Sequence, residues 1–442
     1  SKVEGVVRNA GTHAAGVVIS DKPLVEYLPL HRPTSGSEDS PIKTITQFEM
    51  AVLDSLGMLK VDFLGLAYLT IMQRACEMIE KRHGVKYTLE NIPLDDPQVF
   101  EMLGKGQTAG IFQLEGTGMT RFLVQMKPQN LSNVIAMVAL FRPGPMEFIP
   151  KYIDRLHGAE FEYQHPLLEP IFKETYGIGV YQEQIMQAAV DIAGYSLAEA
   201  DDLRKAISKK QSDKIAKHKQ KFIKGAVEKG LEKPTAEMIF SDWEEFARYG
   251  FNKSHAADYG IMAVETAYLK AHYTVEYLTA LLTVSMSDIA KVSLYVTEAR
   301  NMGIEVLPPD IRYSEWNFSL EDRPEGAPAI RFGLGAIKNV GIAPVDMIIQ
   351  ARAEGTFKDL NDLANRVDLR AVGRRSLECL IKVGALDAFG SRNALLEGLD
   401  NSIAISAANL KARNSGQLSI FDDGGAFSIS IKLPDVPDVD RK

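Results

Sequence analysis

Asp62 is the residue best placed in this sequence for metal-dependent chemistry. It lies within residues 59–66, whose first part belongs to the short run 58–63 typical of a strand. Alternation sends Val61 and Phe63 to the opposite face, so the carboxylate can project into a cleft near the end of the strand. Two-metal phosphoryl transfer needs two or three carboxylates, and no Asp-x-Asp pair stands near Asp62. Two interpretations stay open: a ligand of an incomplete metal site, and a cap for the next helix.

A dense basic segment covers residues 203–224. It holds nine Lys and Arg residues against one acid, Asp213, in a chain whose net charge is −8. The lysines are distributed around the expected helix instead of being paired with acids at four-residue spacing. Such a local excess attracts polyanions, and the alternative is a solvated helix face. We expect phosphate or DNA contacts here, with Lys209, Lys210 and Lys214 among the contacting residues.

Three short motifs carry residue types suited to nucleotide contacts. Arg142 stands on a proline-stiffened turn, residues 141–145. Residues 249–255 place Asn252, Lys253 and His255 just before an expected helix N-terminus, where backbone N–H groups favour a phosphate. In residues 181–184, Gln182 can bind a base or sugar, or the motif can simply satisfy a buried helix end. Plain helix–helix turns remain the alternative for the other two motifs.

Two motifs near the C-terminus suggest macromolecular contacts. Residues 333–341 resemble a helix-hairpin-helix turn, in which glycines let backbone amides approach a DNA phosphate. A poorer copy covers residues 380–386, and a glycine-rich turn without DNA is the alternative. Residues 417–421 place apolar anchors on a polar segment, which is typical of docking into a partner's groove, unless the segment packs back as a strand. The residues concerned are Gly335, Lys338, Asn339 and Gly341 in the hairpin, and Gln417, Leu418 and Phe421 in the tail.

The elements that must position these residues change character along the chain. Residues 13–19, 44–48 and 58–63 read as strands, and a helical period begins at Leu66 and closes at Gly84. We expect roughly ten helices between 95 and 303, short strands at 304–307, 316–320 and 329–333, and helices from 342 to 412. The last thirty residues read as a flexible tail. The predicted fold is therefore mainly α with a small α+β N-terminal portion.

Composition limits the classes that remain. The 442 residues are 45% hydrophobic and 24% charged, enough apolar material for two to four globular domains. Cys76 and Cys379 fit neither a metal-ligand spacing nor a disulfide framework, which favours a reducing cytosol. No run of about 18 apolar residues or signal-peptide layout occurs. The chain begins without Met in the approach to a strand, so we expect part of a longer protein.

Taken together, the motifs resemble the bacterial DNA polymerase III alpha subunits, the C-family replicative polymerases. The resemblance rests on residues 8–18, 60–66, 111–115, 139–145, 181–184 and 250–255, in this order along the chain. It covers nearly the whole chain up to Phe421. It implies four parts: 1–66, the C-terminal part of a polymerase-beta-like palm; 67–303, the fingers; 304–412, a helix-hairpin-helix domain that holds duplex DNA; and 413–442, a tail with a clamp-binding peptide.

The resemblance also implies roles. Asp62 would be the catalytic, metal-binding third carboxylate of a site for two Mg²⁺ ions, and the fingers would receive the deoxynucleoside triphosphate. Arg204 falls where the family presents basic residues to the triphosphate; Lys205 replaces a frequent second Arg and loses its bidentate fork. The same pocket would be completed by Asn252, Lys253 and His255, with Arg142 and Gln182 in support.

Parts of the family pattern are absent from this sequence. The first two metal-binding aspartates would lie upstream of residue 1, and the thumb, the N-terminal PHP domain and the oligonucleotide-binding region are also missing. We therefore expect no polymerisation by this chain alone. The partners implied are primer–template DNA, deoxynucleoside triphosphates, the sliding clamp and other replicase subunits, in the cytoplasm near the nucleoid and away from membranes.

Two other functions fit the same motifs. A non-catalytic DNA- and clamp-binding scaffold derived from this family would use the basic helix, the hairpins and the tail without a metal at Asp62. A helical interaction platform that never touches DNA would show no salt-dependent binding to a primer–template.

Overall fold

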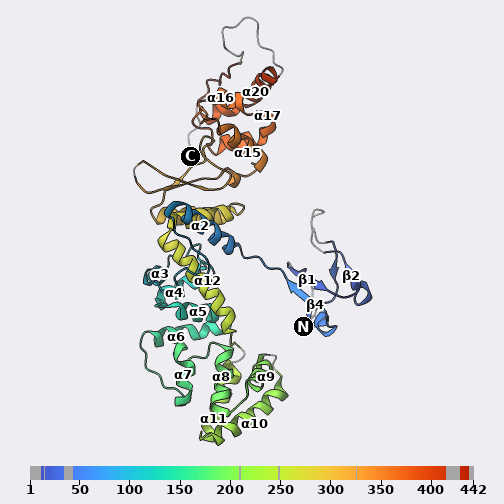
Figure 1. Cartoon of the computed structure of the whole chain (residues 1–442), viewed down its shortest axis with the longest axis vertical. Helices are drawn as coiled ribbons and strands as arrows, with labels where there is room; N and C mark the ends of the chain where they lie inside the picture. Colours follow the sequence, from blue (N-terminus) through green and yellow to red (C-terminus); the bar gives the residue numbers. More distant parts are fainter. Residues whose placement is uncertain are drawn as a thin grey trace. The chain divides into compact units, whose positions relative to one another are not determined.

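The computed structural model describes residues 11–13, 15–33, 43–208, 211–246, 249–324, 326–414 and 429–437. The chain divides into two compact units, Ser1–Ala67 and Tyr68–Lys442. Figure 1 shows that the second unit is built almost entirely of helices, whereas the first holds short strands. The predicted fold class, mainly α with a small α+β N-terminal portion, is confirmed.

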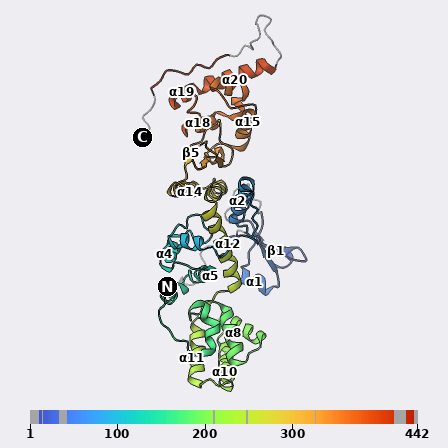
Figure 2. The same cartoon turned by 60° about the vertical axis from the view of Figure 1, so that its left-hand side comes forward.

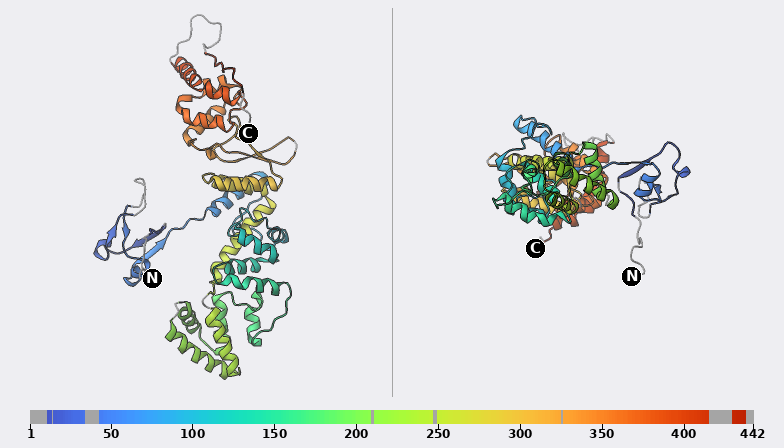
Figure 3. Two further views of the ribbon diagram at one scale, coloured as in Figure 1. Left: turned by 180° about the vertical axis from the view of Figure 1, so that it is seen from behind. Right: turned by 90° about the horizontal axis from the view of Figure 1, so that it is seen from below.

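The N-terminal unit contains two small antiparallel ladders, coloured blue in Figure 3. Strand β1 (Gly16–Ile19) pairs with β4 (Leu59–Asp62), and β2 (Leu30–His31) pairs with β3 (Ile45–Thr46). The register sets Gly16 opposite Asp62. Strands fall within residues 13–19, 44–48 and 58–63 as predicted, but a short helix, α1 (Met50–Ser55), was not expected.

The first core of the second unit surrounds α12 (Lys253–His272), which packs along α5 (Leu131–Leu140). Gly260 makes this possible, because a Cβ there would lie 2.5 Å from Ile135. The helix predicted from Leu66 is α2 (Ala67–His83), closed by Gly84 at φ +69°. The same core is joined by α3 (Pro97–Gly104), α4 (Thr117–Met126), α6 (Ile149–Leu156), α13 (Thr274–Val284) and α14 (Ile289–Asn301).

The second core belongs to four helices that lie side by side in Figures 1 and 2. They are α8 (Gln182–Ala193), α9 (Leu197–Ser208), α10 (Ser212–Glu228) and α11 (Lys233–Phe246). Aromatic contacts between Phe222, Phe240 and Trp243 fill the centre. Short helices lead into this group: η3 (Pro166–Leu168), α7 (Glu169–Phe172) and η4 (Lys173–Thr175), whereas η2 (Pro145–Phe148) precedes α6 in the first core. The described residues between 95 and 303 thus form twelve α-helices, where roughly ten were predicted.

The C-terminal part begins with a three-stranded sheet of order β5-β7-β6. Its strands are β5 (Val306–Leu307), β6 (Ser319–Glu321) and β7 (Ala329–Arg331), close to the predicted runs. A third core follows (Figure 2). It is built on η5 (Leu334–Ala336), α15 (Ile342–Arg352), α16 (Leu360–Arg366), α17 (Leu369–Val372), α18 (Arg374–Lys382), α19 (Arg392–Glu397) and α20 (Leu399–Asn414).

Candidate functional site

A parallel β-bridge between Tyr181 and Phe251, called the joint below, brings two of the predicted motifs together. The Phe251 N–H donates to the Val180 carbonyl at 3.0 Å, and the Gln182 N–H donates to the Phe251 carbonyl at 2.9 Å. The side-chain amide of Gln182 adds a bond to the Gly250 carbonyl at 3.0 Å. The segment before α8 and the segment before α12 therefore run in parallel, although about seventy residues separate them in sequence.

Arg142 holds this joint from the α5 side. Its guanidinium donates to the carbonyls of Ala139 at 2.9 Å and Tyr249 at 3.0 Å, and it lies 3.9 Å from the centre of the Phe251 ring. Burial lowers the pKa of Arg142. Gly144 keeps the turn tight, because φ is +98° and a Cβ would lie 2.4 Å from the Tyr249 ring. Arg142 thus positions the 249–251 segment.

The start of α12 is fixed by acids of two other elements. The Asn252 side chain caps the helix by accepting from the His255 N–H at 2.8 Å, and its amide donates to Glu183 at 2.9 Å. Glu183 also accepts from the Lys253 N–H at 2.9 Å. The Lys253 ammonium donates to both oxygens of Glu174, at 2.7 and 2.9 Å. The N-terminal positive end of α12 is therefore balanced by a carboxylate.

Arg204 reaches the same joint from α9. Its guanidinium donates to Asp201 through Nε at 2.9 Å and Nη2 at 2.8 Å, and to the Gln182 Oε1 through Nη1 at 3.3 Å. Lys205 pairs with the second oxygen of Asp201 at 2.7 Å. These bonds lower the pKa of Asp201, with the Lys205 hydrogen bond the largest cause. The His255 ring completes the cluster, 5.5 Å from the Phe251 ring.

The structure therefore gathers the residues predicted for the nucleotide around one joint. Gln182, Asn252, Lys253 and His255 lie on its two segments or at the adjoining helix start, and Arg142 reaches it from the turn after α5. Arg204 contacts Gln182, and Lys205 pairs with the same acid as Arg204, Asp201. Sequence reasoning missed the acids Glu174, Glu183 and Asp201. Asp201 could have been found from its three- and four-residue spacing to the two cations.

The two glutamines of the motif at residues 181–184 have different roles. Gln184 is buried and accepts from the N–H groups of Val180 and Tyr181, while its amide donates to Thr175 at 2.8 Å. Gln184 thus satisfies a buried helix end, whereas half-buried Gln182 links the joint to Arg204.

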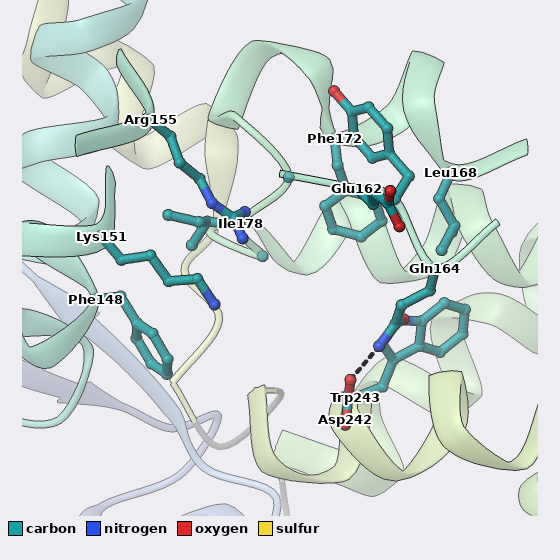
Figure 4. A pocket seen from close by; sticks show the side chains of 13 residues that line it. Phe148, Lys151, Arg155, Glu162, Gln164, Leu168, Phe172, Ile178, Asp242 and Trp243 are labelled. Atoms are coloured by element: carbon teal, nitrogen blue, oxygen red, sulfur yellow. Dashed lines mark hydrogen bonds between the residues drawn. The ribbon is translucent and has the colours of Figure 1, made fainter. Parts of the chain in front are cut away.

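A hollow of about 420 Å³ lies behind the joint, lined partly by residues 177–179. Figure 4 shows Lys151 and Arg155 entering from one side, with Trp243 and Gln164 on the other. Arg155 is fixed by donating to the Tyr176 carbonyl at 2.8 Å, and Gln164 donates to Asp242. The residues predicted for the nucleotide do not line this hollow.

Asp62 lies at the end of β4 on the same face as Lys60, as alternation requires. The Lys60 ammonium approaches its carboxylate at 2.8 Å, and the His13 ring lies 4.0 Å away. The Lys60 hydrogen bond lowers the pKa of Asp62. Gly16, opposite, leaves the space open, because a Cβ there would lie 3.1 Å from the Asp62 oxygen. Helix α2 begins only at Ala67, so the contacts of Asp62 lie on the sheet.

The basic segment is more strongly paired than predicted. Lys214 meets Asp202 at 3.4 Å, and Lys221 meets Glu199. Lys224 pairs with Glu228 at 3.9 Å, four residues on. The expectation that these lysines are not paired with acids at four-residue spacing was therefore wrong for Lys224, and the two other pairs form because α9 packs its carboxylates against α10. Lys209 and Lys210 lie outside the described residues.

Close packing requires Gly335 of the first hairpin, but not Gly341. A Cβ on Gly335 would lie 2.6 Å from the Trp316 ring, whereas Gly341 has open space beyond Pro344 at 3.6 Å. Asn339 adopts φ +67°, and Lys338 is exposed. In the second copy, Gly384 faces Arg392, which a Cβ would meet at 2.1 Å. The tail residues Gln417, Leu418 and Phe421 lie outside the described residues.

The described residues hold neither a metal-binding cluster nor a membrane-spanning helix. Within them, no group of three or more His, Cys, Asp or Glu side chains could hold a metal ion. Across the same ranges, no helix is long and apolar enough to cross a membrane.

Comparisons with known proteins match the chain in three successive blocks. Residues 1–65 match the bacterial DNA polymerase III alpha NTPase domain, 68–230 the bacterial DNA polymerase III alpha subunit finger domain, and 303–396 a helix-hairpin-helix motif. The DNA polymerase III subunit alpha of Thermus aquaticus is 45% identical over 95% of this chain and 34% of its own length. That of Bacillus subtilis is 43% identical over 98% of this chain and 38% of its own length. The chain thus spans about a third of the relatives it matches.

Proposed function

The chain belongs to the bacterial DNA polymerase III alpha subunit family, and on that premise we propose that it supplies part of the catalytic subunit for template-directed DNA synthesis. The reaction is nucleotidyl transfer: the primer 3′-hydroxyl attacks the α-phosphate of a deoxynucleoside triphosphate, and pyrophosphate leaves. The observation that carries this proposal is the joint between α8 and α12, which collects the candidate nucleotide residues from distant segments.

At this joint the cations would position the triphosphate. Arg204 is half-exposed and presents its guanidinium beside Gln182, while Lys205 adds a point charge on the same turn. Arg142 and Asn252 are already engaged with backbone groups, so their part is to hold the 249–252 segment in place. Catalysis by such a site would come mostly from positioning and electrostatics.

Membership of this family implies a divalent-metal-dependent polymerase, and we propose two Mg²⁺ ions for the complete enzyme. Asp62 fits as one ligand, because its carboxylate is ionised and partly exposed and contacts the sheet, not the start of α2. It does not fit as the whole site, since the described residues hold no cluster that could bind a metal. The remaining carboxylates would come from the part of the longer relatives that this chain does not span.

The other proposed partners follow from separate segments. The helix-hairpin-helix match and the family together support DNA binding, which we assign to duplex DNA at residues 303–396. Residues 417–421 would dock on the sliding clamp, and other replicase subunits would assemble around the longer protein. A cytoplasmic enzyme near the nucleoid fits these partners.

The triphosphate assignment is tested by binding a fluorescent deoxynucleoside triphosphate to the purified chain. Arg204→Gln should weaken binding by about ten- to a hundredfold, because a charge-assisted hydrogen bond contributes about 1.5–3 kcal/mol. Arg323→Gln is the matched control, since Arg323 is similarly exposed and also pairs with one acid, Glu305 at 2.7 Å. Equal losses in both variants would refute the assignment.

The incomplete metal site predicts that the chain alone does not extend a primer. A primer-extension assay with excess Mg²⁺ should show no template-dependent product. Extension that Asp62→Asn abolishes would contradict this and would mean that the chain builds a complete site itself.

A further inference from the structure

Helices α9 and α10 enclose a charged cleft apart from the joint. Its volume is about 530 Å³, and its lining is nearly all charged. Figure 1 shows the two helices side by side. The lining residues are Ala198, Glu199, Asp202, Lys214, Lys217, His218 and Lys221.

The lysines form one stripe. Positions 214, 217 and 221 are three and four residues apart, which places them on one face of α10 over about 10 Å of its axis. Lys214 and Lys221 are paired, whereas Lys217 is exposed and meets no acid in the described part of the chain. The stripe therefore keeps a positive excess.

The acids of α9 hold the stripe in place. Asp202 accepts from Lys214 at 3.4 Å and from His218 at 3.1 Å, and Glu199 binds Lys221. Tyr195 supports α10 beside the cleft: its hydroxyl donates to the His218 carbonyl at 2.9 Å, and the Lys221 ammonium lies 5.0 Å from the centre of its ring. The Lys221 hydrogen bond, aided by Ser196, lowers the pKa of Glu199 to about 2. The His218 hydrogen bond, followed by that of Lys214, lowers the pKa of Asp202 as well, so both acids are ionised and present carboxylates where phosphates would bind.

We propose that this cleft binds successive phosphates of a nucleic-acid strand, and that Glu199 and Asp202 occupy it as internal competitors that the strand displaces. The inference rests on the proposed function, because it takes the strand to be the enzyme's DNA. Exposed ion pairs contribute little to stability, so exchanging them is inexpensive, whereas phosphate binding releases counterions from DNA. The length of the stripe suits a strand better than a single triphosphate.

The test measures binding of the whole chain to a fluorescein-labelled primer–template by anisotropy over a series of salt concentrations. The paired variant Glu199→Gln with Asp202→Asn should bind about fivefold tighter or more at low salt, since it removes the competitors. The control, Glu232→Gln with Glu237→Gln, changes net charge equally at exposed positions around the start of α11 and should gain less. Glutamine at 199 can keep the cap with Ser196, so folding should persist.

A second variant avoids any loss of an ion pair. Lys217→Gln should lower the slope of log affinity against log salt by about 0.9, the value for one phosphate contact. Unlabelled dATP in excess should reduce strand binding to the same extent in the wild type and in the cleft variants.

The possible outcomes separate the two proposals. Equal gains in the cleft and control variants, an unchanged slope for Lys217→Gln, or a selective effect of dATP would overturn the cleft assignment while leaving the nucleotide joint intact. A wild-type chain that binds no DNA at any salt concentration would overturn both the cleft and the DNA part of the proposed function.

Discussion

Replacing Lys270 with Met is expected to loosen the loop at residues 107–115 by about 3–5 kcal/mol. Lys270 lies on α12 with its side chain fully buried, at 0% exposure. Its ammonium donates to the carbonyls of Gln107 and Ala109, both at 2.8 Å, and to Glu298 at 2.6 Å. One side chain thus joins the loop, α12 and α14.

The magnitude follows from what the substitution leaves behind. Glu298, only 14% exposed, would lose its cation, and two carbonyls would lose their donor. Breaking a buried ion pair from one side costs about 3–5 kcal/mol, because the remaining charge is uncompensated. Burial also lowers the pKa of Lys270 in spite of Glu298. The pair is therefore not strongly favourable, so Lys270→Met combined with Glu298→Gln should recover much of the loss.

The assay is hydrogen exchange followed by mass spectrometry on peptides covering residues 107–115 and α12. The single variant should speed exchange in both, and the double variant less so. Lys105→Met is the matched control, because Lys105 also pairs with a glutamate, Glu101 at 2.6 Å, but at an exposed site; it should cost under about 1 kcal/mol. If Lys270→Met exchanged no faster than Lys105→Met, the reasoning from burial would be refuted.

Two further predictions concern the same unit, Tyr68–Lys442. Burial raises the pKa of Glu265, which is 3% exposed, to about 7; the folded state therefore holds this proton while the unfolded chain releases it, so stability should fall between about pH 4.5 and 7 by about 3 kcal/mol. Glu265→Gln should abolish that slope in thermal unfolding measured across pH, and an unchanged slope would assign it to another group. Gly335→Ala should cost about 1–3 kcal/mol by overpacking against Trp316, whereas Gly341→Ala should be nearly neutral; equal melting temperatures would contradict this.

Local signals in the sequence predicted the local structure well. Gly84 ends α2 because a left-handed residue is needed there, and Asp96 caps α3 through the Gln98 N–H at 2.7 Å. Both depend on neighbours within a few residues. Helix α1 escaped prediction because its six residues follow Glu49, which makes no side-chain cap, and no long period marks it.

The pairing of charges could not be predicted in the same way. Lys221 meets Glu199 across 22 residues, and Lys253 meets Glu174 across 79. Neither spacing repeats with the helical period, so only the packing of α9 on α10, or of η4 beside α12, brings the partners together. The hairpin glycines illustrate the same limit, since Trp316 stands some twenty residues before Gly335 and gives no local hint of the contact.

The ion pairs at the joint affect how strongly a polyanion would bind there. At the joint, Asp201 holds Arg204 and Lys205, and Glu174 holds Lys253. A phosphate that binds those cations must exchange with a carboxylate, so the free energy of binding is the difference between two charge-assisted interactions. Because the carboxylates also fix the rotamers of the cations, the side chains pay less ordering entropy when a phosphate arrives. These acids, which sequence reasoning missed, would therefore lower the affinity for phosphate and at the same time fix the orientation of the cations. A substitution that removes Asp201 should separate these two effects.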